Sequence, residues 1–230
     1  TSPDIFSFYQ FLNKASNNEI DVFCFEASSH GLSQARIGDY KVDYAFFTNL
    51  SHDHLDYHEN MENYFQAKKL LFTKHLKADG LAFINIDDDY GKRLENELSD
   101  KNIVTIASYD QDADIYYSKI SANEISVKYQ NQLVKLKHDF IADFQITNFV
   151  MALALFIKEL AINLDSLNDS ASSLKPVKGR LELYRMPGLD AKIYIDFAHT
   201  PDAMENVLKD IRTNTQNRLI VVFGCGGDRD

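Results

Sequence analysis

The sequence predicts an α/β fold, with a mostly parallel sheet flanked by helices in residues 1–176 and the beginning of a second α/β domain in residues 177–230. Two observations predict this class. Short apolar runs alternate along the chain with longer segments whose apolar residues recur at helical spacing. The runs Ile20–Glu26 and Val42–Asn49 are largely apolar, as in strands buried on both faces of a parallel sheet.

The first helix is predicted over Pro3–Asn17. Its start signal is Thr1-Ser2-Pro3, because hydroxyl side chains cap helices and proline favours the first helical turn. The two apolar strand runs follow it. An amphipathic helix is then predicted over Met61–Leu76, and a strand over Leu81–Ile86 that ends in the acidic turn Asp87–Asp89.

The middle of the chain changes character. Residues 112–138 alternate between apolar and polar, which predicts β-hairpins with a turn near Gln130-Asn131. A helix is predicted over Ile146–Ala161. The polar stretch 165–175 then precedes Pro176, and this composition is typical of a loop between domains.

The last segment starts a new alternation of strands and helix. Strands are predicted at Leu181–Arg185 and Lys192–Phe197, a helix at Pro201–Thr213 and a further strand at Arg218–Gly224. About 50 residues with an open strand edge do not make a complete domain, so we expect this part to be the beginning of one.

Composition narrows the function classes. Hydrophobic residues make up 45% of the chain and aromatic residues 12%, which indicates a packed core. The net charge of −10 disfavours binding to nucleic acid or to a membrane surface, because polyanions would be repelled. An anionic small ligand remains possible, since it needs only a few local cations and backbone N–H groups.

The sequence favours the cytoplasm. Cys24 and Cys225 lie in apolar runs without a pairing pattern, so we expect buried or loop thiols and a reducing compartment. No apolar run approaches the roughly 18 residues of a membrane span, and no signal-peptide pattern is present. Because the first residue is Thr1, we expect the natural N-terminus to lie upstream.

The densest polar cluster is Ser51–His58, just after a predicted buried strand. It holds three histidines and two aspartates in the sequence SHDHLDYH. Loops beyond the carboxyl ends of parallel strands are where α/β sheets bind ligands. The cluster therefore predicts a functional site, with an ordinary polar surface loop as the alternative.

Two charged residues have both an ordinary and a functional interpretation. Glu26 ends an apolar run, where a carboxylate must reach solvent or meet a cation. It is interpreted either as a Mg²⁺ ligand facing the histidine-rich loop or as a cap of the next helix. Lys68 is followed by Lys69 in a predicted helix, and this pair by itself indicates a solvated helix face.

Two further segments resemble anion-binding turns. Ser28–Gly31, with Arg36 behind it, offers hydroxyls and a guanidinium that could clamp a phosphate or carboxylate. A Ser-His hydrolase is disfavoured, because no G-x-S-x-G elbow is present. Gly224–Arg229 is a tight glycine-rich turn, but no segment of the chain has the G-x-x-x-x-G-K-[ST] pattern of a P-loop.

Taken together, the motifs resemble the Mur ligase family, and within it the tripeptide synthetases. They follow one another in the family's order over nearly the whole chain. The matching segments are Glu26–Leu32 (EASSHGL), Phe47–His58 (FTNLSHDHLDYH), Tyr64–Lys68 (YFQAK), Gly179–Glu182 (GRLE), Asp196–Ala203 (DFAHTPDA) and Phe223–Asp230 (FGCGGDRD).

The resemblance implies an ATP-dependent amide ligase of peptidoglycan synthesis, and thus of cell-wall biogenesis, cell shape and cell division. ATP would phosphorylate the D-Glu γ-carboxylate of UDP-MurNAc-L-Ala-D-Glu, and the amine of diaminopimelate or lysine would attack the acyl phosphate. Mg²⁺ is the implied metal, and the protein is expected to act as a monomer. The alternatives are another ligase of the superfamily, such as a folylpolyglutamate synthetase, or a non-catalytic nucleotide-binding relative.

The resemblance also implies the domains. Residues 1–176 match a central ATPase domain without its N-terminal P-loop part, and residues 177–230 match the beginning of a Rossmann-like C-terminal domain. Because a P-loop is needed around the phosphates, the 230-residue chain alone is expected to be inactive.

Residue roles carry over by position. Glu26, His54 and a carbamylated Lys68 match Mg²⁺ ligands, and Lys68 and His199 match catalytic positions. Substrate-binding positions are matched by Thr1, Ser2, Ser28, Gln34, Arg36 and, for the incoming amino acid, Arg229. Nucleotide-contacting positions are matched by Asn148, Arg180 and Asp196. The chain departs from the family pattern at Gln145, where asparagine is usual, at Phe197, where tyrosine is common, and at His52, where arginine is frequent.

Overall fold

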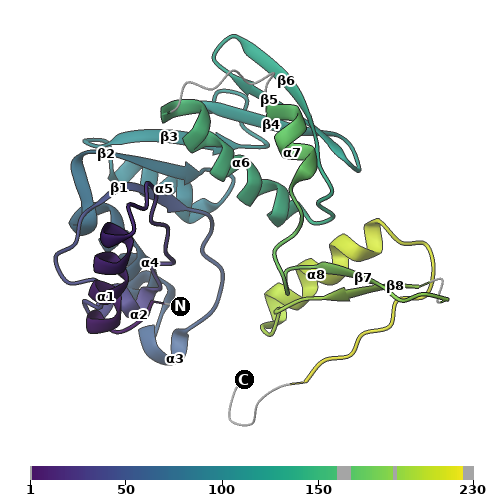
Figure 1. Cartoon of the computed structure of the whole chain (residues 1–230), viewed down its shortest axis with the longest axis horizontal. Coiled ribbons are helices and arrows are strands. Elements are labelled where there is room, and N and C mark those ends of the chain that lie inside the picture. The colour runs from purple at the N-terminus through teal and green to yellow at the C-terminus, as the bar shows by residue number, and fades with distance from the viewer. Residues whose placement is uncertain (1, 160–166, 189–190, 225–230) are drawn as a thin grey trace. The chain divides into compact units, whose positions relative to one another are not determined.

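The computed structural model describes residues 2–159, 167–188 and 191–224 (Figure 1). The chain divides into two compact units, residues 1–107 and 108–230. Within the described ranges, no helix is long and apolar enough to cross a membrane. Cys24 is an exposed free thiol, while Cys225 lies outside the described residues.

The first unit contains three parallel strands, β1 (Val42–Phe47), β2 (Leu76–Asn85) and β3 (Asn102–Ala107). Figure 1 shows them side by side, with β2 between the other two. The central strand is fully buried at Ala82, Phe83 and Ile84, as its apolar run requires. This confirms the mostly parallel sheet.

Helices flank these strands. They are α1 (Ile5–Asn17), α2 (Ser29–Ser33), α3 (Leu55–His58), α4 (Met61–Leu70) and α5 (Asp89–Glu97). The predicted start of α1 at Thr1-Ser2-Pro3 was wrong. The cap is Asp4, whose carboxylate accepts hydrogen bonds from Ser7 N at 3.0 Å and from Ser7 Oγ at 2.6 Å.

The strand predicted at Ile20–Glu26 does not form among the described residues. The segment is extended, but no neighbouring strand in the described ranges pairs with it, and strand assignment requires such a partner. Val22 is 73% exposed, whereas Phe25 packs against the buried cluster of Phe8, Leu32 and Ile37. The prediction of a buried strand in this segment was therefore wrong.

The helix predicted over Met61–Leu76 changes form near its end. Regular α-helix stops at Leu70, and Leu71–His75 forms a π-turn, labelled η1. The helix cannot continue because Leu76 is extended and already pairs with Val42 in the sheet. β2 consequently begins five residues before its predicted start.

The corner between β2 and α5 holds the loop that follows β1. Asp88 caps α5 by accepting from Gly91 N at 3.0 Å, and it also accepts from Leu50 N at 3.2 Å. The side-chain amide of Asn85 donates to the carbonyl oxygen of Thr48 at 2.8 Å. The start of the histidine-rich loop is thus fixed to the neighbouring strand.

The second unit begins with three antiparallel strands, β4 (Ile115–Ser121), β5 (Glu124–Tyr129) and β6 (Gln132–Lys137). The predicted turn at Gln130-Asn131 is confirmed, with Gln130 at a φ of 52°. Two helices follow.

These helices are α6 (Asp143–Glu159) and α7 (Leu167–Ser173). α6 starts three residues before its predicted start. Gln145 explains this difference, because its side-chain oxygen accepts from the backbone N–H groups of Ile141 and Ala142 ahead of the helix. α7 corrects the prediction of an unstructured stretch at residues 165–175, of which 165 and 166 lie outside the described residues.

The end of the chain contains an antiparallel pair, β7 (Glu182–Arg185) and β8 (Lys192–Ile195), and α8 (Pro201–Thr213). The predicted bounds of α8 are confirmed. The strand predicted at Arg218–Gly224 does not form among the described residues, because nothing there pairs with it. A buried cluster of Ala142, Leu181, Val207 and Ile211 is the core of this region.

Candidate functional site

Histidine and tyrosine rings gather where α2, α3 and α4 meet in the first unit. The ring of His30 lies 4.1 Å from that of Tyr57 and 5.0 Å from that of His54, measured between centroids. His58 stacks on Tyr64 at 5.0 Å with 14° between the ring planes. Three residues of the polar loop, His54, Tyr57 and His58, therefore contact rings of α2 or α4, and of the loop's eight residues His58 is buried and five are exposed.

Lys68 lies beside this ring cluster. Its Nζ is 5.8 Å from the centroid of the Tyr64 ring, one helical turn earlier in α4. Burial lowers the pKa of Lys68 below its usual range, although the carboxylates of Glu26 and Asp53 act in the opposite direction. A lysine with a lowered pKa offers more neutral amine, so Lys68 does not behave as the solvated helix-face residue that its sequence context alone indicates.

The same two carboxylates also affect the pKa of Tyr64. Burial, followed by the charges of Asp53 and Glu26, raises the pKa of Tyr64 to about 12. Glu26 itself is exposed, and its carboxylate charge acts on both Lys68 and Tyr64. Negative charge therefore faces the amine of Lys68.

A small cavity of about 50 Å³ opens beside Lys68. Ala27, Phe47, Thr48 and Asn49 are among the residues that line it. A water molecule occupies roughly 30 Å³ of liquid, so the cavity has room for one or two water-sized groups next to the amine.

The residues matched to substrate binding form one hydrogen-bonded network. Ser2 Oγ donates to the carbonyl oxygen of Glu26 at 2.9 Å and accepts from Ser28 N at 2.8 Å. Arg36 donates to the carbonyl oxygen of Ser2 at 3.2 Å, and its Nε and one terminal nitrogen both donate to Gln34 Oε1, at 3.0 and 2.7 Å. Four predicted residues thus lie together, while Thr1 falls outside the described residues.

Gly31 is required for this close packing. A Cβ at this position would lie 2.6 Å from both Cβ and Oγ of Ser2, closer than real Cβ atoms approach. Ser28 Oγ caps α2 by accepting from Gly31 N at 3.1 Å. The small residues of the Ser-Ser-His-Gly motif therefore allow the N-terminus of α2 to pack on Ser2.

The predicted metal ligands are Glu26, His54 and Lys68. His54 lies at the start of α3 with a φ of 58°, and its Nδ1 is 3.4 Å from a carboxylate oxygen of Asp53. Within the described residues, no group of three His, Cys, Asp or Glu side chains is placed to hold a metal ion. The predicted set of Glu26, His54 and Lys68 contains only two such side chains, so the assignment stays a prediction. Oxygen donors with a lowered-pKa lysine next to them fit Mg²⁺ once that lysine carries a carboxylate.

Sequence reasoning gave no individual role to four residues of this cluster, Ser29, Asp53, Tyr57 and Tyr64, although the first three lie in segments predicted to be functional. The hydrogen bond from the Gln34 amide to Tyr57 Oη at 3.2 Å joins residues 23 positions apart, so no local pattern predicts it.

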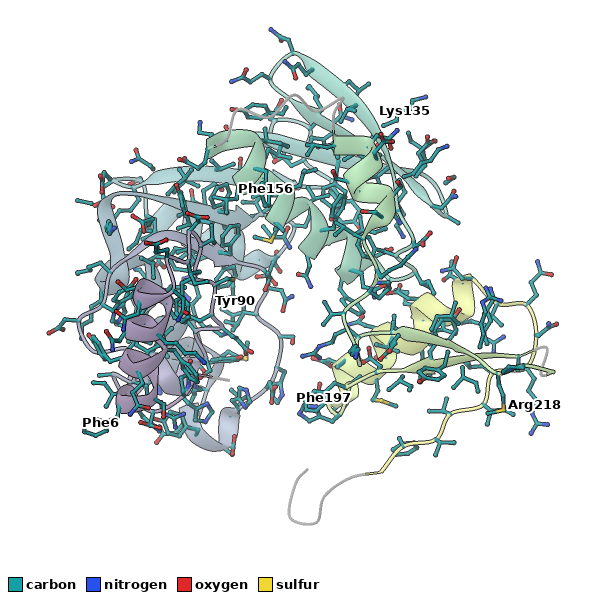
Figure 2. The ribbon with its side chains drawn as sticks, viewed as in Figure 1. Phe6, Tyr90, Lys135, Phe156, Phe197 and Arg218 are labelled. Carbon is teal, nitrogen blue, oxygen red and sulfur yellow. The ribbon has the colours of Figure 1, made fainter. Side chains whose placement is uncertain are left out.

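A second group of predicted residues surrounds Phe197, which is 66% exposed and labelled in Figure 2. The guanidinium of Arg180 lies 5.3 Å from the ring centroid of Phe197, and the ring of His199 meets it edge-on at 5.2 Å. Asp196 accepts from Leu181 N and from Ala198 N, both at 2.7 Å. Arg180, Asp196 and His199 therefore converge.

Two predicted residues do not join this group. Asn148 lies exposed on α6, and Arg229 lies outside the described residues. Gln145, on the same helix as Asn148, has a structural role: its side-chain amide donates to the carbonyl oxygen of Arg180 at 2.8 Å. Gln145 therefore joins the start of α6 to the backbone of Arg180.

Comparison with protein-family models identifies the class. Residues 1–156 match the Mur ligase middle domain, and residues 179–230 match the Mur ligase, glutamate ligase domain. The chain belongs to the Mur ligase family.

Two relatives within the family have the same name. The chain is 40% identical over 232 residues to the UDP-N-acetylmuramoyl-L-alanyl-D-glutamate--2,6-diaminopimelate ligase of Fusobacterium nucleatum, covering 100% of this chain and 47% of the relative. It is 36% identical over 236 residues to the ligase of the same name from Rickettsia typhi, with the same two coverages. The chain thus spans about half the length of the curated relatives it matches.

Solved structures agree with the fold. A structure of a UDP-N-acetylmuramoyl-L-alanyl-D-glutamate--2,6-diaminopimelate ligase superimposes with a TM-score of 0.67 at 33% identity, covering 89% of this chain and 42% of the other. The MurF ligase of Thermotoga maritima, solved in complex with ADP, gives a TM-score of 0.65 at 19% identity, covering 81% and 42%. The second likeness concerns the fold alone.

Proposed function

We propose that the whole protein is an ATP-dependent amide ligase that adds the third amino acid, diaminopimelate or lysine, to UDP-MurNAc-L-Ala-D-Glu in peptidoglycan synthesis. The observation that carries this proposal is the connected network of Ser2, Ser28, Gln34 and Arg36 close to Lys68 with its lowered pKa. The 40% identity to a diaminopimelate ligase along the full chain supports it and favours diaminopimelate.

The chain's residues suit the recognition of an anionic substrate. The guanidinium of Arg36 is already oriented by the side chain of Gln34 and the backbone of Ser2, so little side-chain freedom is lost when it binds a carboxylate or phosphate. The N-terminus of α2 adds backbone N–H groups beside Ser28. We assign to these residues the positioning of the nucleotide-linked dipeptide.

The reaction forms one amide and consumes one ATP. An oxygen of the D-Glu γ-carboxylate attacks the terminal phosphorus of ATP, and ADP leaves. The amine of the incoming diamino acid then attacks the acyl carbon, phosphate leaves, and the nitrogen loses a proton. Such transfers depend on positioning and on charge neutralisation more than on covalent help from the protein.

Lys68 has a defined role in this proposal. Its neutral amine adds CO₂ and loses a proton, giving a carbamate whose oxygens would hold Mg²⁺ together with Glu26 and His54. Mg²⁺, when bound, neutralises the phosphate oxygens of ATP. Burial of the Lys68 amine supports this role, because only the neutral amine reacts with CO₂.

The remaining assignments follow the same proposal. Residues 1–176 form the central ATPase domain, in which Asn148 contacts the nucleotide. Residues 177–230 begin the C-terminal domain, in which Arg180 and Asp196 contact the nucleotide, His199 takes part in catalysis and Arg229 meets the incoming amino acid. The sequence has no P-loop, so that loop would lie elsewhere in the whole protein. We further propose that the protein is a monomer and acts in the cytoplasm, where ATP is available.

The test is phosphate release by the full-length protein with ATP and Mg²⁺. We expect release that depends on both UDP-MurNAc-L-Ala-D-Glu and diaminopimelate. Lysine in place of diaminopimelate, and a folate with glutamate, serve as substrate controls. Release with the folate pair alone would assign a folylpolyglutamate synthetase, and no Mg²⁺-dependent release with any pair would indicate a non-catalytic relative.

A further inference from the structure

We infer that His58 is a positioning residue, which ties α2, α3 and α4 together and thereby holds the amine of Lys68 beside Tyr64. The inference rests on the proposed function only for the role of Lys68. The geometry that carries it is independent of any ligand.

His58 is buried and shares a hydrogen bond with a buried hydroxyl. Its exposure is 5%, and its Nε2 shares a hydrogen bond of 2.9 Å with Ser29 Oγ, which is 1% exposed. A buried imidazole needs such a partner, and a buried hydroxyl needs one equally. This bond therefore fixes α3 against the first residue of α2.

The other contact of His58 reaches toward the lysine. Its ring lies nearly parallel to that of Tyr64, at 5.0 Å and 14°. Tyr64 precedes Lys68 by four residues in α4, so the two side chains share one helix face, and Lys68 Nζ lies 5.8 Å from the Tyr64 ring centroid. His58 thus packs on the ring that the lysine amine lies over.

α3 cannot hold this position by itself. It has one turn, and both flanking residues, His54 and Glu59, have positive φ angles of 58° and 68°, which non-glycine residues rarely adopt. Strained backbone of this kind persists only where surrounding contacts determine it. His58 is the one buried side chain of α3, and its contacts add to those of Tyr57 with Gln34 and His30 in holding this turn in place.

Each joined segment carries part of the predicted site. α2 begins beside Ser28, α3 follows His54, and α4 carries Lys68, while α2 and α3 both pack on α4. Loss of the His58–Ser29 bond would let α3 shift relative to the other two helices. The expected result is a misplaced His54 and a Lys68 amine with more freedom.

Two variants break the same bond from opposite sides. His58→Phe keeps a ring for stacking on Tyr64 but loses the bond, and Ser29→Ala loses it while the imidazole remains. The matched control is His75→Phe, because His75 is also buried, at 1% exposure, and bonds instead to the carbonyl oxygen of Tyr40 at 3.0 Å. All three variants lose one hydrogen bond of a buried imidazole.

The first measurement is labelling of lysines by a small acylating reagent in CO₂-depleted buffer, read by peptide mass spectrometry. We expect Lys68 to be labelled about tenfold faster in both site variants, as the loss of a buried hydrogen bond allows. Lys69, which bonds to Glu97 at 2.6 Å, should keep its rate. The double variant should match the single ones within about twofold, because both remove one interaction.

The second measurement separates positioning from simple packing. In the full-length ligase we expect the half-saturating Mg²⁺ concentration to rise about tenfold in His58→Phe and Ser29→Ala, with an unchanged KM for the diamino acid. His75→Phe should lower the melting temperature comparably without either effect. Equal behaviour of the His58 and His75 variants in both measurements would overturn the inference.

The outcomes also separate this inference from the proposed function. If the wild-type protein has no ligase activity, the proposed function fails, but the labelling of Lys68 still decides the role of His58. If His58→Phe does not fold, Ser29→Ala still tests the bond, since it removes only one oxygen atom. Unchanged labelling of Lys68 in a folded Ser29→Ala variant would refute the inference.

Discussion

Gly91→Ala should damage the corner that holds the histidine-rich loop. A Cβ at this position would lie 1.9 Å from the carbonyl oxygen of Asn85, and the obstacle is backbone, which cannot rotate away. Real Cβ atoms essentially never approach closer than 3.0 Å, so the corner must open by at least the difference, about 1 Å. The same corner holds Leu50 through Asp88 and Thr48 through Asn85.

The magnitude follows from two effects. Forcing one extra carbon into a packed position costs about 1–3 kcal/mol. Opening the corner also weakens the Asp88 cap of α5, which is worth about 1 kcal/mol. We therefore expect Gly91→Ala to lower the free energy of unfolding by about 2–4 kcal/mol.

Urea unfolding of the 230-residue chain, followed by circular dichroism, measures this loss. The matched control is Gly224→Ala, because nothing lies within 4 Å of a Cβ at Gly224. It should change stability by less than about 0.5 kcal/mol. A Gly91→Ala protein as stable as this control would show that the backbone contact is not rigid, and the reasoning would be refuted.

Other changes test the site and its surroundings. Lys68→Ala in the full-length protein should abolish ligase turnover, with partial rescue by added short carboxylates. Lys69→Ala should keep turnover and cost less than about 1 kcal/mol of stability, because exposed ion pairs contribute little. Equal turnover in the two variants would remove Lys68 from the mechanism. Arg36→Ala should raise the KM for UDP-MurNAc-L-Ala-D-Glu about tenfold or more, because a guanidinium contact to an anion is lost, and leave the KM for ATP unchanged. An unchanged KM for UDP-MurNAc-L-Ala-D-Glu would contradict the assignment of Arg36 to substrate binding. Glu62 accepts hydrogen bonds from the side chain of Arg93, and these bonds lower the pKa of Glu62 from 4.5 to about 2. The stabilisation from this carboxylate is therefore complete above pH 4.5 and is lost as the pH falls toward 2. Acid titration of Glu62→Gln should therefore show a smaller loss of stability across that window than wild type, and identical profiles would exclude the pair as a contributor.

Much of the fold was predictable because the signals are local. The apolar run at Val42–Asn49, the turn at Gln130-Asn131 and the helix at Pro201–Thr213 were all recovered. The helix is the clearest case: Thr200 Oγ1 accepts from Ala203 N at 3.3 Å and Pro201 fills the first turn, both of which are visible within a few residues of sequence.

Pairing was not predictable in the same way. The segments Ile20–Glu26 and Arg218–Gly224 have strand-like composition, yet neither forms a strand among the described residues. A strand exists only when its backbone groups meet those of another segment, and that partner is not encoded in the run itself. The end of α4 at Leu70 has the same cause, since the pairing of Leu76 in the sheet stops the helix.

The sequence by itself determined the family, the α/β class and the residue types available for chemistry. Only the tertiary structure decided which of them act together. It placed Lys68 over Tyr64, stacked His58 on that ring and bonded it to Ser29. It also linked Arg36 to Ser2 across 34 positions of sequence. The physical reason is that burial and close contact depend on distance in space. Two adjacent lysines look alike in the sequence, but in the fold burial lowers the pKa of Lys68 while Lys69 forms an ion pair with Glu97.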